Sequence, residues 1–374
     1  MSPVRGRPLV LHVLEAIESG TSRHLVDLVR TATRTQHVVV VPKERVGGST
    51  DFGAASEMRT AGGEVVFVPM TRSPLTAVNA RAIASLRHLI HARHPDVVHG
   101  HSSVGGLLAR VAGLGTGAAL VYTPHAVAAG RVARTAEQLL GRFTDVFVAV
   151  SATEAAEARR SLVGSERVVE IPNGIELAPP APASLRHLLG VNDGVPIVGT
   201  MGRLAAQKAP EVFLAAAEAI HRSHPAVRFV QIGTGPDANA YARRVARSAI
   251  GEKFYQIASL PKASRYLGDL SVFVLTSRFE GGPYAPLEAI RAGVPVVLTD
   301  VVGNADVIEH ERSGLLVPVD DAEATARAVV RVLDDVVLQR QLTDAASLRL
   351  RDRFDVREMG RAHDALYQRL AEST

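Results

Sequence analysis

The chain has 374 residues, a formal net charge of +4, and neither cysteine nor tryptophan. This length exceeds what one hydrophobic core usually holds, which predicts two domains, and the lack of cysteine excludes disulfides and thiolate metal sites. Aromatic residues make up only 4% of the chain, which disfavours a nucleic-acid partner because base-stacking platforms need them.

The first residues do not have the pattern of a secretion or membrane signal. The apolar run Leu9–Leu14 is interrupted by His12 and stopped by Glu15, unlike the core of a signal peptide. No stretch approaches the roughly 18 consecutive apolar residues of a membrane span. We expect a cytoplasmic protein, and leave open a peripheral contact with the inner face of an anionic membrane.

Short apolar runs alternate with helix-like segments such as Ser22–Arg34 from the start of the chain. Runs such as VVVV at 38–41 are typical of parallel strands buried on both faces, and the helices between them fit right-handed crossovers. The first series of predicted strands is Leu9–Leu14, Val38–Pro42, Val65–Pro69, Asp96–Gly100, Leu120–Pro124, Val146–Ser151 and Val168–Pro172.

One Pro/Ala-rich segment, Leu177–Ser184, interrupts the alternation and predicts a linker. We place domains at 1–176 and 187–352, a linker at 177–186, and a C-terminal helix at 353–374 that crosses back to the first domain. Two open parallel sheets facing across a cleft are expected, with ligands at the carboxyl ends of the strands. The second series is Ile197–Met201, Arg228–Ile232, Phe254–Ile257, Ser271–Thr276, Val294–Leu298 and Gly314–Val317.

The strongest motif, Phe279 to Ala289, directly follows a predicted strand. Its glycines permit a tight turn and close backbone approach, and Pro286 suits the first position of a helix. Amides at the helix start would make an anion site, flanked by the carboxylates of Glu280 before the turn and Glu288 on the first helical turn. The alternative is that Glu288 only forms a capping box with Ala285.

A second motif follows the first strand of the second half, where Arg203 and Lys208 bracket a short loop before a helix at Glu211. Two cations at the carboxyl end of a strand can grip a diphosphate, the arginine through a bidentate fork and the lysine as a point charge. Two basic residues in a loop are also common on solvated surfaces. The prediction of a diphosphate site at Arg203 and Lys208 therefore depends on the Glu280 motif being nearby.

Together these motifs resemble glycosyltransferase family 4 and its GT-B relatives, whose fold has two Rossmann-like domains. The resemblance covers nearly the whole chain and rests on Arg-x4-Lys, on Glu-x7-Glu within FEG-x-P-x-x-x-LEA, and on further segments. These segments are Val121–His125, Ala149–Ser151, Ile171–Gly174, Asp96–Ser103 and Gly314–Pro318.

The resemblance implies a role for each matching residue. Arg203 and Lys208 hold the donor diphosphate, Glu280 lies by the donor sugar, Glu288 binds the ribose, and His125 faces the sugar from the acceptor-binding N-terminal domain. The implied catalytic set is His125, Glu280, Arg203 and Lys208. The implied donor-binding set adds Gly20, Gly233, Gly235, Gly281, Gly282, Pro283, Tyr284, Ala285 and Glu288, and the acceptor side adds His101 and Ser102.

Two departures from the family pattern affect this assignment. The loop after the first strand, Glu18–Thr21, has Ser19 where many members have glycine, so its donor contacts do not transfer directly. Ala126 and Val127 replace the Gly-Phe that often follows the family's histidine, so no acceptor contact is carried over there.

The chain contains no Asp-x-Asp, the usual holder of a metal on the diphosphate. Fixed cations and helix-terminal amides therefore have to stabilise the leaving group, best in a closed, dry cleft that brings His125 to the cations. We expect no metal and no cofactor. Family members retain the anomeric configuration, which favours a front-face mechanism in which the leaving phosphate assists deprotonation of the acceptor.

Three other features are weighed against plainer explanations. Gly233–Ala238 matches GxGxxA formally, but its position in the second half argues against a dehydrogenase. His99 and His101 form a possible metal pair, but with no matching carboxylates a structural role is favoured. The basic residues of Ala80–Arg93 form either a solvated helix face or a contact with anionic lipid.

The predicted activity is a retaining, metal-independent transfer of a sugar from a nucleoside-diphosphate sugar, UDP preferred, to a hydroxyl acceptor. The acceptor is a glycolipid, a polysaccharide or the aglycone of a secondary metabolite. The alternatives are a sugar-nucleotide epimerase, a phosphorylase-like protein of the same fold, and an inactive binding subunit. An epimerase would not release nucleoside diphosphate in response to an acceptor.

Overall fold

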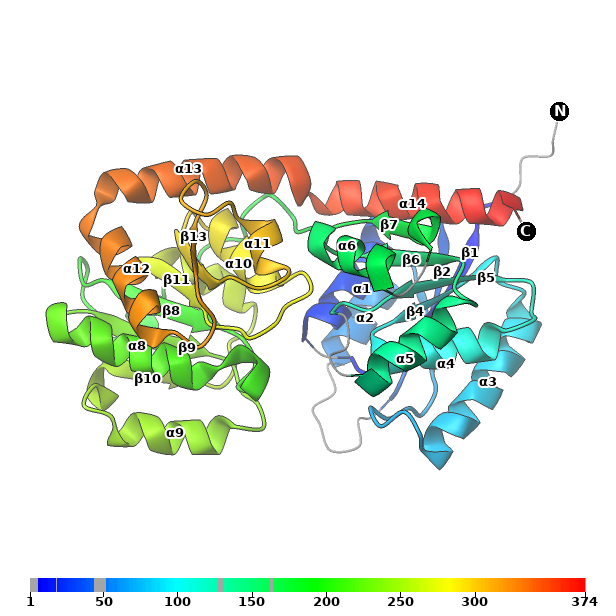
Figure 1. Ribbon diagram of the computed structural model, residues 1–374, viewed down its shortest axis with the longest axis horizontal. Coiled ribbons are helices and arrows are strands. Elements are labelled where there is room, and N and C mark those ends of the chain that lie inside the picture. The colour runs from blue at the N-terminus through cyan, green and yellow to red at the C-terminus, as the bar shows by residue number, and fades with distance from the viewer. Residues whose placement is uncertain (1–5, 18, 44–51, 127–130, 162–163, 374) are drawn as a thin grey trace. The chain divides into compact units, whose positions relative to one another are not determined.

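The computed structural model describes residues 6–17, 19–43, 52–126, 131–161 and 164–373 (Figure 1). The chain divides into two compact units. Unit 1 contains Met1–Gly174 and Val356–Thr374, and unit 2 contains Ile175–Asp355. Among the described residues no helix combines the length and apolarity needed to cross a membrane.

Unit 1 is built on a seven-stranded parallel sheet with the order β3-β2-β1-β4-β5-β6-β7. Its strands are β1 (Leu9–Leu14), β2 (Gln36–Val41), β3 (Glu64–Phe67), β4 (Val97–His101), β5 (Ala119–Thr123), β6 (Val146–Ala149) and β7 (Val168–Glu170). Its helices are α1 (Ser19–Thr31), α2 (Phe52–Thr60), α3 (Ala77–Arg93), α4 (Ser103–Gly113), α5 (Arg131–Gly141), α6 (Ala152–Ser161), η1 (Ser165–Arg167) and α14 (Val356–Ser373).

Unit 2 is built on a six-stranded parallel sheet with the order β10-β9-β8-β11-β12-β13. Its strands are β8 (Ile197–Met201), β9 (Arg228–Ile232), β10 (Phe254–Ile257), β11 (Val272–Leu275), β12 (Val296–Thr299) and β13 (Leu315–Val317). Its helices are α7 (Leu185–Leu189), η2 (Ala206–Lys208), α8 (Pro210–Ser223), α9 (Ala238–Arg247), η3 (Gly251–Lys253), η4 (Ala263–Asp269), α10 (Tyr284–Arg291), α11 (Asn304–Val307), α12 (Ala322–Asp334) and α13 (Val336–Arg353).

The predicted α/β class and the two Rossmann-like parallel sheets are confirmed. Every predicted strand is present, with ends displaced by at most two residues, which is the normal uncertainty of element boundaries. The strands are buried on both faces because helices cover the sheet on each side. In β1, for example, Val10 and Leu14 pack into one core cluster while Leu11 and Val13 pack into another.

The segment expected to be a linker, 177–186, lies within unit 2. Hydrogen bonds hold this segment in place. The amide of Ala183 donates to Arg265 O at 3.0 Å, and Arg265 Nε donates to Ala181 O at 2.7 Å. The hydroxyl of Ser184 then caps α7 by accepting from the amide of His187 at 3.1 Å. The Pro/Ala segment is therefore docked on the unit that follows it.

The last helix, α14, belongs to unit 1, where it packs against α1. The carboxylate of Asp364 on α14 accepts from Thr35 Oγ1 at 2.7 Å and from the amide of Arg34 at 3.1 Å, just beyond the end of α1. A Cβ at Gly360 would lie 2.5 Å from Thr31 Oγ1, so the two helices touch at this glycine.

A buried ion pair joins α4 to α5 in unit 1. The guanidinium of Arg110, 1% exposed, donates to the carboxylate of Glu137 at 2.9 and 3.2 Å and lies 3.9 Å from the centre of the Tyr122 ring. Removing the carboxylate leaves a buried cation without a counterion, and such a loss typically costs about 3–5 kcal/mol.

We therefore expect Glu137→Ala to lower the free energy of unfolding by about 3–5 kcal/mol, measured by denaturant titration. The matched control is Glu64→Ala, which removes the exposed pair of Glu64 with Arg93 and should cost at most about 1 kcal/mol. Equal effects of the two substitutions would show that burial of the Arg110 pair has no energetic consequence.

Candidate functional site

The two strongest sequence motifs meet at the carboxyl ends of the adjacent strands β8 and β11 in unit 2. Lys208, at the end of η2, forms an ion pair through its Nζ with the Glu280 carboxylate. Their side chains are 22% and 7% exposed, so the pair is largely shielded from water. Residues predicted from separate parts of the sequence thus form one charged centre.

Hydrogen bonds hold the two loops together beside this ion pair. The amide of Arg278 donates to Gln207 O at 2.8 Å, and Gln207 Nε2 donates to Phe279 O at 3.0 Å. The guanidinium of Arg278 donates to Ala206 O at 2.7 Å and pairs with the Glu211 carboxylate at 2.6 Å. Arg278 was not among the predicted site residues, although it lies directly before the Glu280 motif.

Arg203 lies in the loop after β8, and its side chain is half-buried. Its guanidinium makes no hydrogen bond or ion pair with any described residue. By contrast, the cation of Lys208 is already partnered by Glu280. The positive charge of Arg203 is therefore available to an anionic ligand at this edge of the sheet.

Gly233 and Gly235 let the loop after β9 pack directly on the Arg203 loop. Gly233 has a φ of +132°, and a Cβ there would lie 2.1 Å from Gly202 O. A Cβ at Gly235 would lie 2.2 Å from Leu204 O. These glycines position the loop that carries Arg203, and a direct contact of either with a donor stays a prediction.

Helix α10 begins at Tyr284, two residues before the predicted start at Pro286. Because Pro283 is its N-cap, the capping-box partner position is occupied by Pro286, and the capping-box explanation of Glu288 is wrong. Glu288 lies on the second turn of the helix, not on the first as predicted. The proline is tolerated because the amides of the first turn have no partner within the helix.

Gly303, in the loop after β12, supports the Glu280–Gly281 turn. It has a φ of +85°, and a Cβ there would lie 2.5 Å from Gly281 O. Any side chain at this position would displace the turn. Gly303 was not among the predicted site residues, because a single glycine after a strand does not show which backbone it approaches.

In unit 1, His125 follows β5 with a φ of 60°, which is unfavourable for a residue with a side chain. Its ring is half-buried and lies edge-on to His24, with 4.6 Å between the ring centres. The Nε2 of His125 is 3.4 Å from His101 Nδ1. The strained backbone beside packed imidazoles makes this strand end a candidate functional position.

The acceptor contact predicted for His101 needs correction, whereas that of Ser102 stays a prediction. His101 is fully buried, so its side chain has no exposed surface through which to touch an acceptor. The Ser102 hydroxyl donates to the carboxylate of Glu15, which also accepts from the amide of Gly105 at 3.0 Å. Glu15, missed as a functional residue, fixes Ser102 and the start of α4.

The predicted loop at 18–21 is helical where the structure describes it. Gly20 is exposed in the first turn of α1 rather than in a loop after β1. Its predicted approach to the phosphates therefore depends on a helix N-terminus and not on a flexible glycine loop. Glu18 lies outside the described residues, as does Val127.

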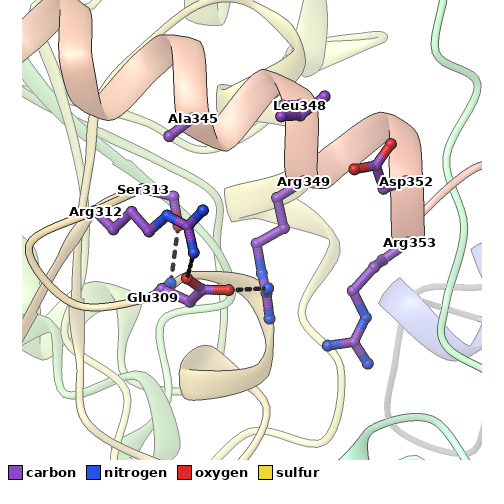
Figure 2. A pocket seen from close by; sticks show the side chains of 8 residues that line it. All are labelled: Glu309, Arg312, Ser313, Ala345, Leu348, Arg349, Asp352 and Arg353. Carbon is purple, nitrogen blue, oxygen red and sulfur yellow. Dashed lines mark hydrogen bonds and ion pairs between the residues drawn. The ribbon is translucent and has the colours of Figure 1, made fainter.

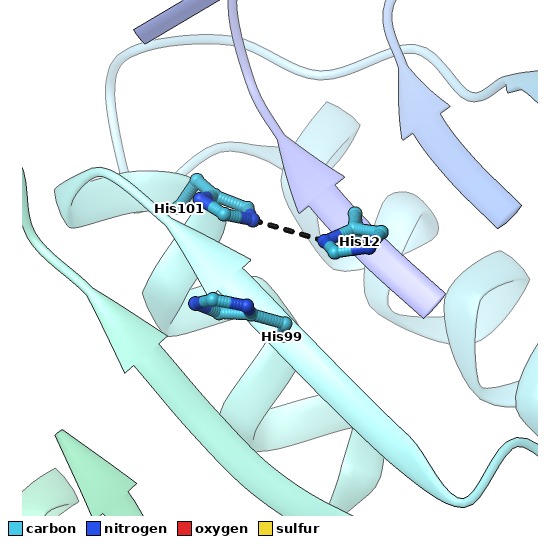
Figure 3. A group of neighbouring side chains, drawn as sticks. All are labelled: His12, His99 and His101. Carbon is cyan, nitrogen blue, oxygen red and sulfur yellow. Dashed lines mark hydrogen bonds between the residues drawn. The ribbon is translucent and has the colours of Figure 1, made fainter. Parts of the chain in front are cut away.

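Seven histidines gather in unit 1 on and beside α1 and α14, and six of them are buried. Figure 3 shows His12 on β1 facing His101 on β4, with His99 beside them. Burial is the main cause that lowers the pKa of each, and it lowers the pKa of His363 to about 4. The cluster comprises His12, His24, His37, His99, His101, His125 and His363.

His99 does not behave as one half of a metal pair with His101. Its Nδ1 is 2.7 Å from the Tyr367 hydroxyl, and its Nε2 is 2.8 Å from Thr123 Oγ1. Both nitrogens are thus occupied by neutral partners, in agreement with the structural role favoured from the sequence.

A pocket on unit 2 lies between α13 and the segment before β13 (Figure 2). Three of its charged groups pair with one another, since the Glu309 carboxylate pairs with Arg312 at 2.8 Å and with Arg349 at 2.6 Å. Arg349 also donates to Val307 O at 2.9 Å, which ties α13 to the end of α11. None of the predicted site residues lines this pocket, and its arginine network serves the packing of α13.

The basic residues predicted to form a face near Ala80–Arg93 lie on α3, and some of them bond to other parts of unit 1. Arg87 donates to Leu114 O at 2.9 Å, and Arg93 pairs with Glu64. Arg81, His88 and His91 are exposed.

Family comparisons agree with the two-unit division. A model described as Glycosyltransferase Family 4 matches residues 19–179, and one described as Glycosyl transferases group 1 matches residues 195–335. The chain is 29% identical over 291 residues to the UDP-Gal:alpha-D-GlcNAc-diphosphoundecaprenol alpha-1,3-galactosyltransferase of Escherichia coli, covering 73% of this chain and 75% of the relative.

Two further proteins are similar. The alpha-maltose-1-phosphate synthase of Mycolicibacterium smegmatis is 31% identical over 286 residues, which span 68% of this chain and 73% of the relative. HepE from Anabaena, solved in complex with UDP and glucose, has a TM-score of 0.83 at 17% identity, covering 97% of this chain and 100% of that one. At that identity the similarity shows the fold alone.

Proposed function

The chain belongs to glycosyltransferase family 4, the group 1 glycosyltransferases, and from this premise we propose a retaining transfer of a sugar from a UDP-sugar without a divalent ion. It is an enzyme of GT-B fold. The observation that carries the proposal is the Lys208–Glu280 ion pair, which joins the two motifs at one edge of the sheet.

Arg203 and Lys208 neutralise the diphosphate in this proposal. Negative charge develops on the leaving diphosphate as the glycosidic bond breaks, and cations fixed in advance stabilise that charge without reorganisation. The Lys208 ammonium has three donors, so it can keep Glu280 as a partner while it binds a phosphate oxygen. Glu280 beside it supplies a carboxylate for the donor sugar, and Glu288 binds the ribose.

His125 contacts the donor sugar, as the family resemblance implies, and UDP is the favoured nucleotide. Two features support the donor: the free charge of Arg203 and the UDP-bound structure of the similar HepE fold. Retention proceeds at the front face, with the leaving phosphate accepting the acceptor proton. A covalent sugar trapped on Glu280 would refute this mechanism.

The acceptor we favour carries a phosphate or diphosphate. This rests on the names of the two relatives, one of which acts on a diphosphoundecaprenol-linked sugar while the other makes a sugar 1-phosphate. A lipid-linked acceptor would require contact with a membrane surface, for which the exposed Arg81, His88 and His91 of α3 are candidates.

The test uses the full chain in EDTA. A panel of nucleotide sugars should include a UDP-sugar that raises the melting temperature, and UDP should be released only when a phosphorylated acceptor is present. NMR of the product should show the anomeric configuration of the donor. Conversion of the UDP-sugar into a second UDP-sugar without acceptor would favour the epimerase alternative, and stabilisation only after adding Mg²⁺ would contradict metal-independent binding.

A further inference from the structure

Two buried nitrogens of the histidine cluster, His24 Nε2 and His363 Nε2, have no hydrogen-bond partner among the described residues. His24 lies on α1 with no exposed surface, and its Nε2 makes no hydrogen bond with any described group. Its Nδ1 is 2.9 Å from Asn173 Oδ1. Because an amide oxygen only accepts, Nδ1 carries the hydrogen, and Nε2 presents a lone pair to the interior. A buried acceptor without a donor points to a missing ligand.

A chain of hydrogen bonds fixes the tautomers of the neighbouring rings. Ala32 O accepts from His37 Nε2 at 2.9 Å, so His37 Nδ1 accepts from His12 Nε2 at 3.0 Å. His12 Nδ1 then accepts from His101 Nε2 at 3.1 Å. The Nδ1 of His101, the last atom in this series of hydrogen bonds, is therefore left with a lone pair that points toward His125.

The spacing of these atoms suits a metal ion better than a hydrogen bond. His101 Nδ1 and His125 Nε2 are 3.4 Å apart, which is long for a hydrogen bond. Two nitrogens bound to one tetrahedral ion at about 2.0–2.1 Å are separated by about 3.4 Å. The ligand atoms of His24, His101 and His125 all lie within 4.8 Å of one another.

We propose that His24 Nε2, His101 Nδ1 and His125 Nε2 bind one divalent transition-metal ion of the zinc class. Imidazole suits Zn²⁺, Co²⁺, Ni²⁺ and Cu²⁺, whereas Mg²⁺ and Ca²⁺ need oxygen ligands. The proton on His125 Nε2 moves to its Nδ1, so three neutral imidazoles coordinate the ion and the fourth position takes water. Asn173 and His12 orient the ligands from outside, as the outer hydrogen bonds of metal-binding histidines do.

A rival set, His12, His99 and His101, also has its ligand atoms within 4.8 Å. It is the poorer site because both nitrogens of His99 and both of His12 already form hydrogen bonds. Binding there would break several of these contacts, whereas the proposed set loses only the long contact of His101 with His125 and satisfies His24.

Binding of this ion is separate from the proposed transfer, which needs no metal at the diphosphate. One consequence of binding, inhibition of transfer by zinc, does rest on the proposed function. An ion bound to His125 Nε2 prevents that nitrogen from contacting the donor sugar. Dialysis measures binding without any turnover. A failure of the transferase assignment would therefore leave the metal site intact, and the reverse also holds.

The experiment is equilibrium dialysis of the EDTA-stripped full chain against Zn²⁺. We expect one tightly bound ion per chain, and a loss of affinity of at least about 100-fold in His24→Gln, more than the loss of an outer hydrogen bond causes. The control His91→Gln changes an exposed histidine and should bind as the wild type does. Unchanged binding by His24→Gln, or loss of binding by His99→Gln with His24→Gln intact, would overturn the proposal.

Spectroscopy of the unmodified chain covers the case in which a variant does not fold. Co²⁺ at the site should give the intense visible bands of a tetrahedral ion, and X-ray absorption of the zinc form should show three imidazole ligands. A six-coordinate Co²⁺ spectrum together with fewer than two imidazoles on zinc would contradict the assignment.

Discussion

Lys208→Met should lower kcat by about 10²- to 10³-fold, the usual loss when one fixed group that stabilises transition-state charge is removed. The substitution keeps the length of the aliphatic chain, which lies 3.6 Å from the position of a Cβ on Gly202, and deletes only the ammonium. Turnover with saturating donor and acceptor in EDTA measures the effect.

The same substitution leaves the Glu280 carboxylate, 7% exposed, without its partner. A buried charge left unsatisfied costs about 1–3 kcal/mol or more, so the single variant is also expected to be less stable. The double variant Lys208→Met/Glu280→Gln removes both charges and should recover stability but not turnover. If the double variant regains activity along with stability, Lys208 acts through folding and not on the diphosphate.

Mild acid should unfold unit 1 because its buried histidines are held neutral. Burial lowers the pKa of five fully buried histidines, and for His363 the value is about 4. The other four, whose pKa lies well below its ordinary value, are His12, His24, His99 and His101.

The direction of the pH dependence follows from which state binds more protons. In the unfolded chain each histidine titrates near its ordinary pKa of about 6.5, whereas in the folded chain it stays neutral until far lower pH. The unfolded state therefore takes up more protons as the pH falls. The stability present above pH about 6.5 is lost progressively toward the folded pKa, which for His363 is about 4.

Each such histidine costs about 1 kcal/mol at pH 5.5, so the five together cost several kcal/mol, a large fraction of the total stability of many domains. We expect the urea midpoint of unit 1, followed by circular dichroism in EDTA, to fall steeply between pH 7.5 and 5.5. His363→Gln should reduce the slope by about one proton. A midpoint that stays constant over this range would mean that the cluster is charged or hydrated in the folded state.

The strand pattern could be predicted because each buried parallel strand is a continuous apolar run, and such runs depend only on local sequence. The proximity of Lys208 and Glu280 could also be predicted, because both residues follow strands and the carboxyl ends of parallel strands lie at one edge of the sheet. The start of α10 was misplaced because proline was assumed at the first helical position, whereas the first turn accepts it later as well.

The histidine cluster could not be predicted in the same way. Its members come from β1, α1, β2, β4, the end of β5 and α14, and His363 reaches the others only through the packing of α14 against α1. His12 interrupts an apolar strand, which signalled that it was unusual but not which residues it would meet. Glu15 acts through the hydrogen bonds that its carboxylate accepts, and Gly303 acts through close backbone approach. In neither case does the local sequence indicate the partner.

The central claim is that unit 2 holds a nucleoside diphosphate with protein cations alone, and calorimetric titration of UDP in EDTA tests it most directly. Wild type should bind UDP, and Arg203→Gln should raise Kd at least about tenfold, or about 1.4 kcal/mol. The matched control Arg228→Gln removes a cation at the opposite end of the same sheet and should leave Kd unchanged. Equal Kd values for wild type and Arg203→Gln, or binding that appears only with Mg²⁺, would contradict the account.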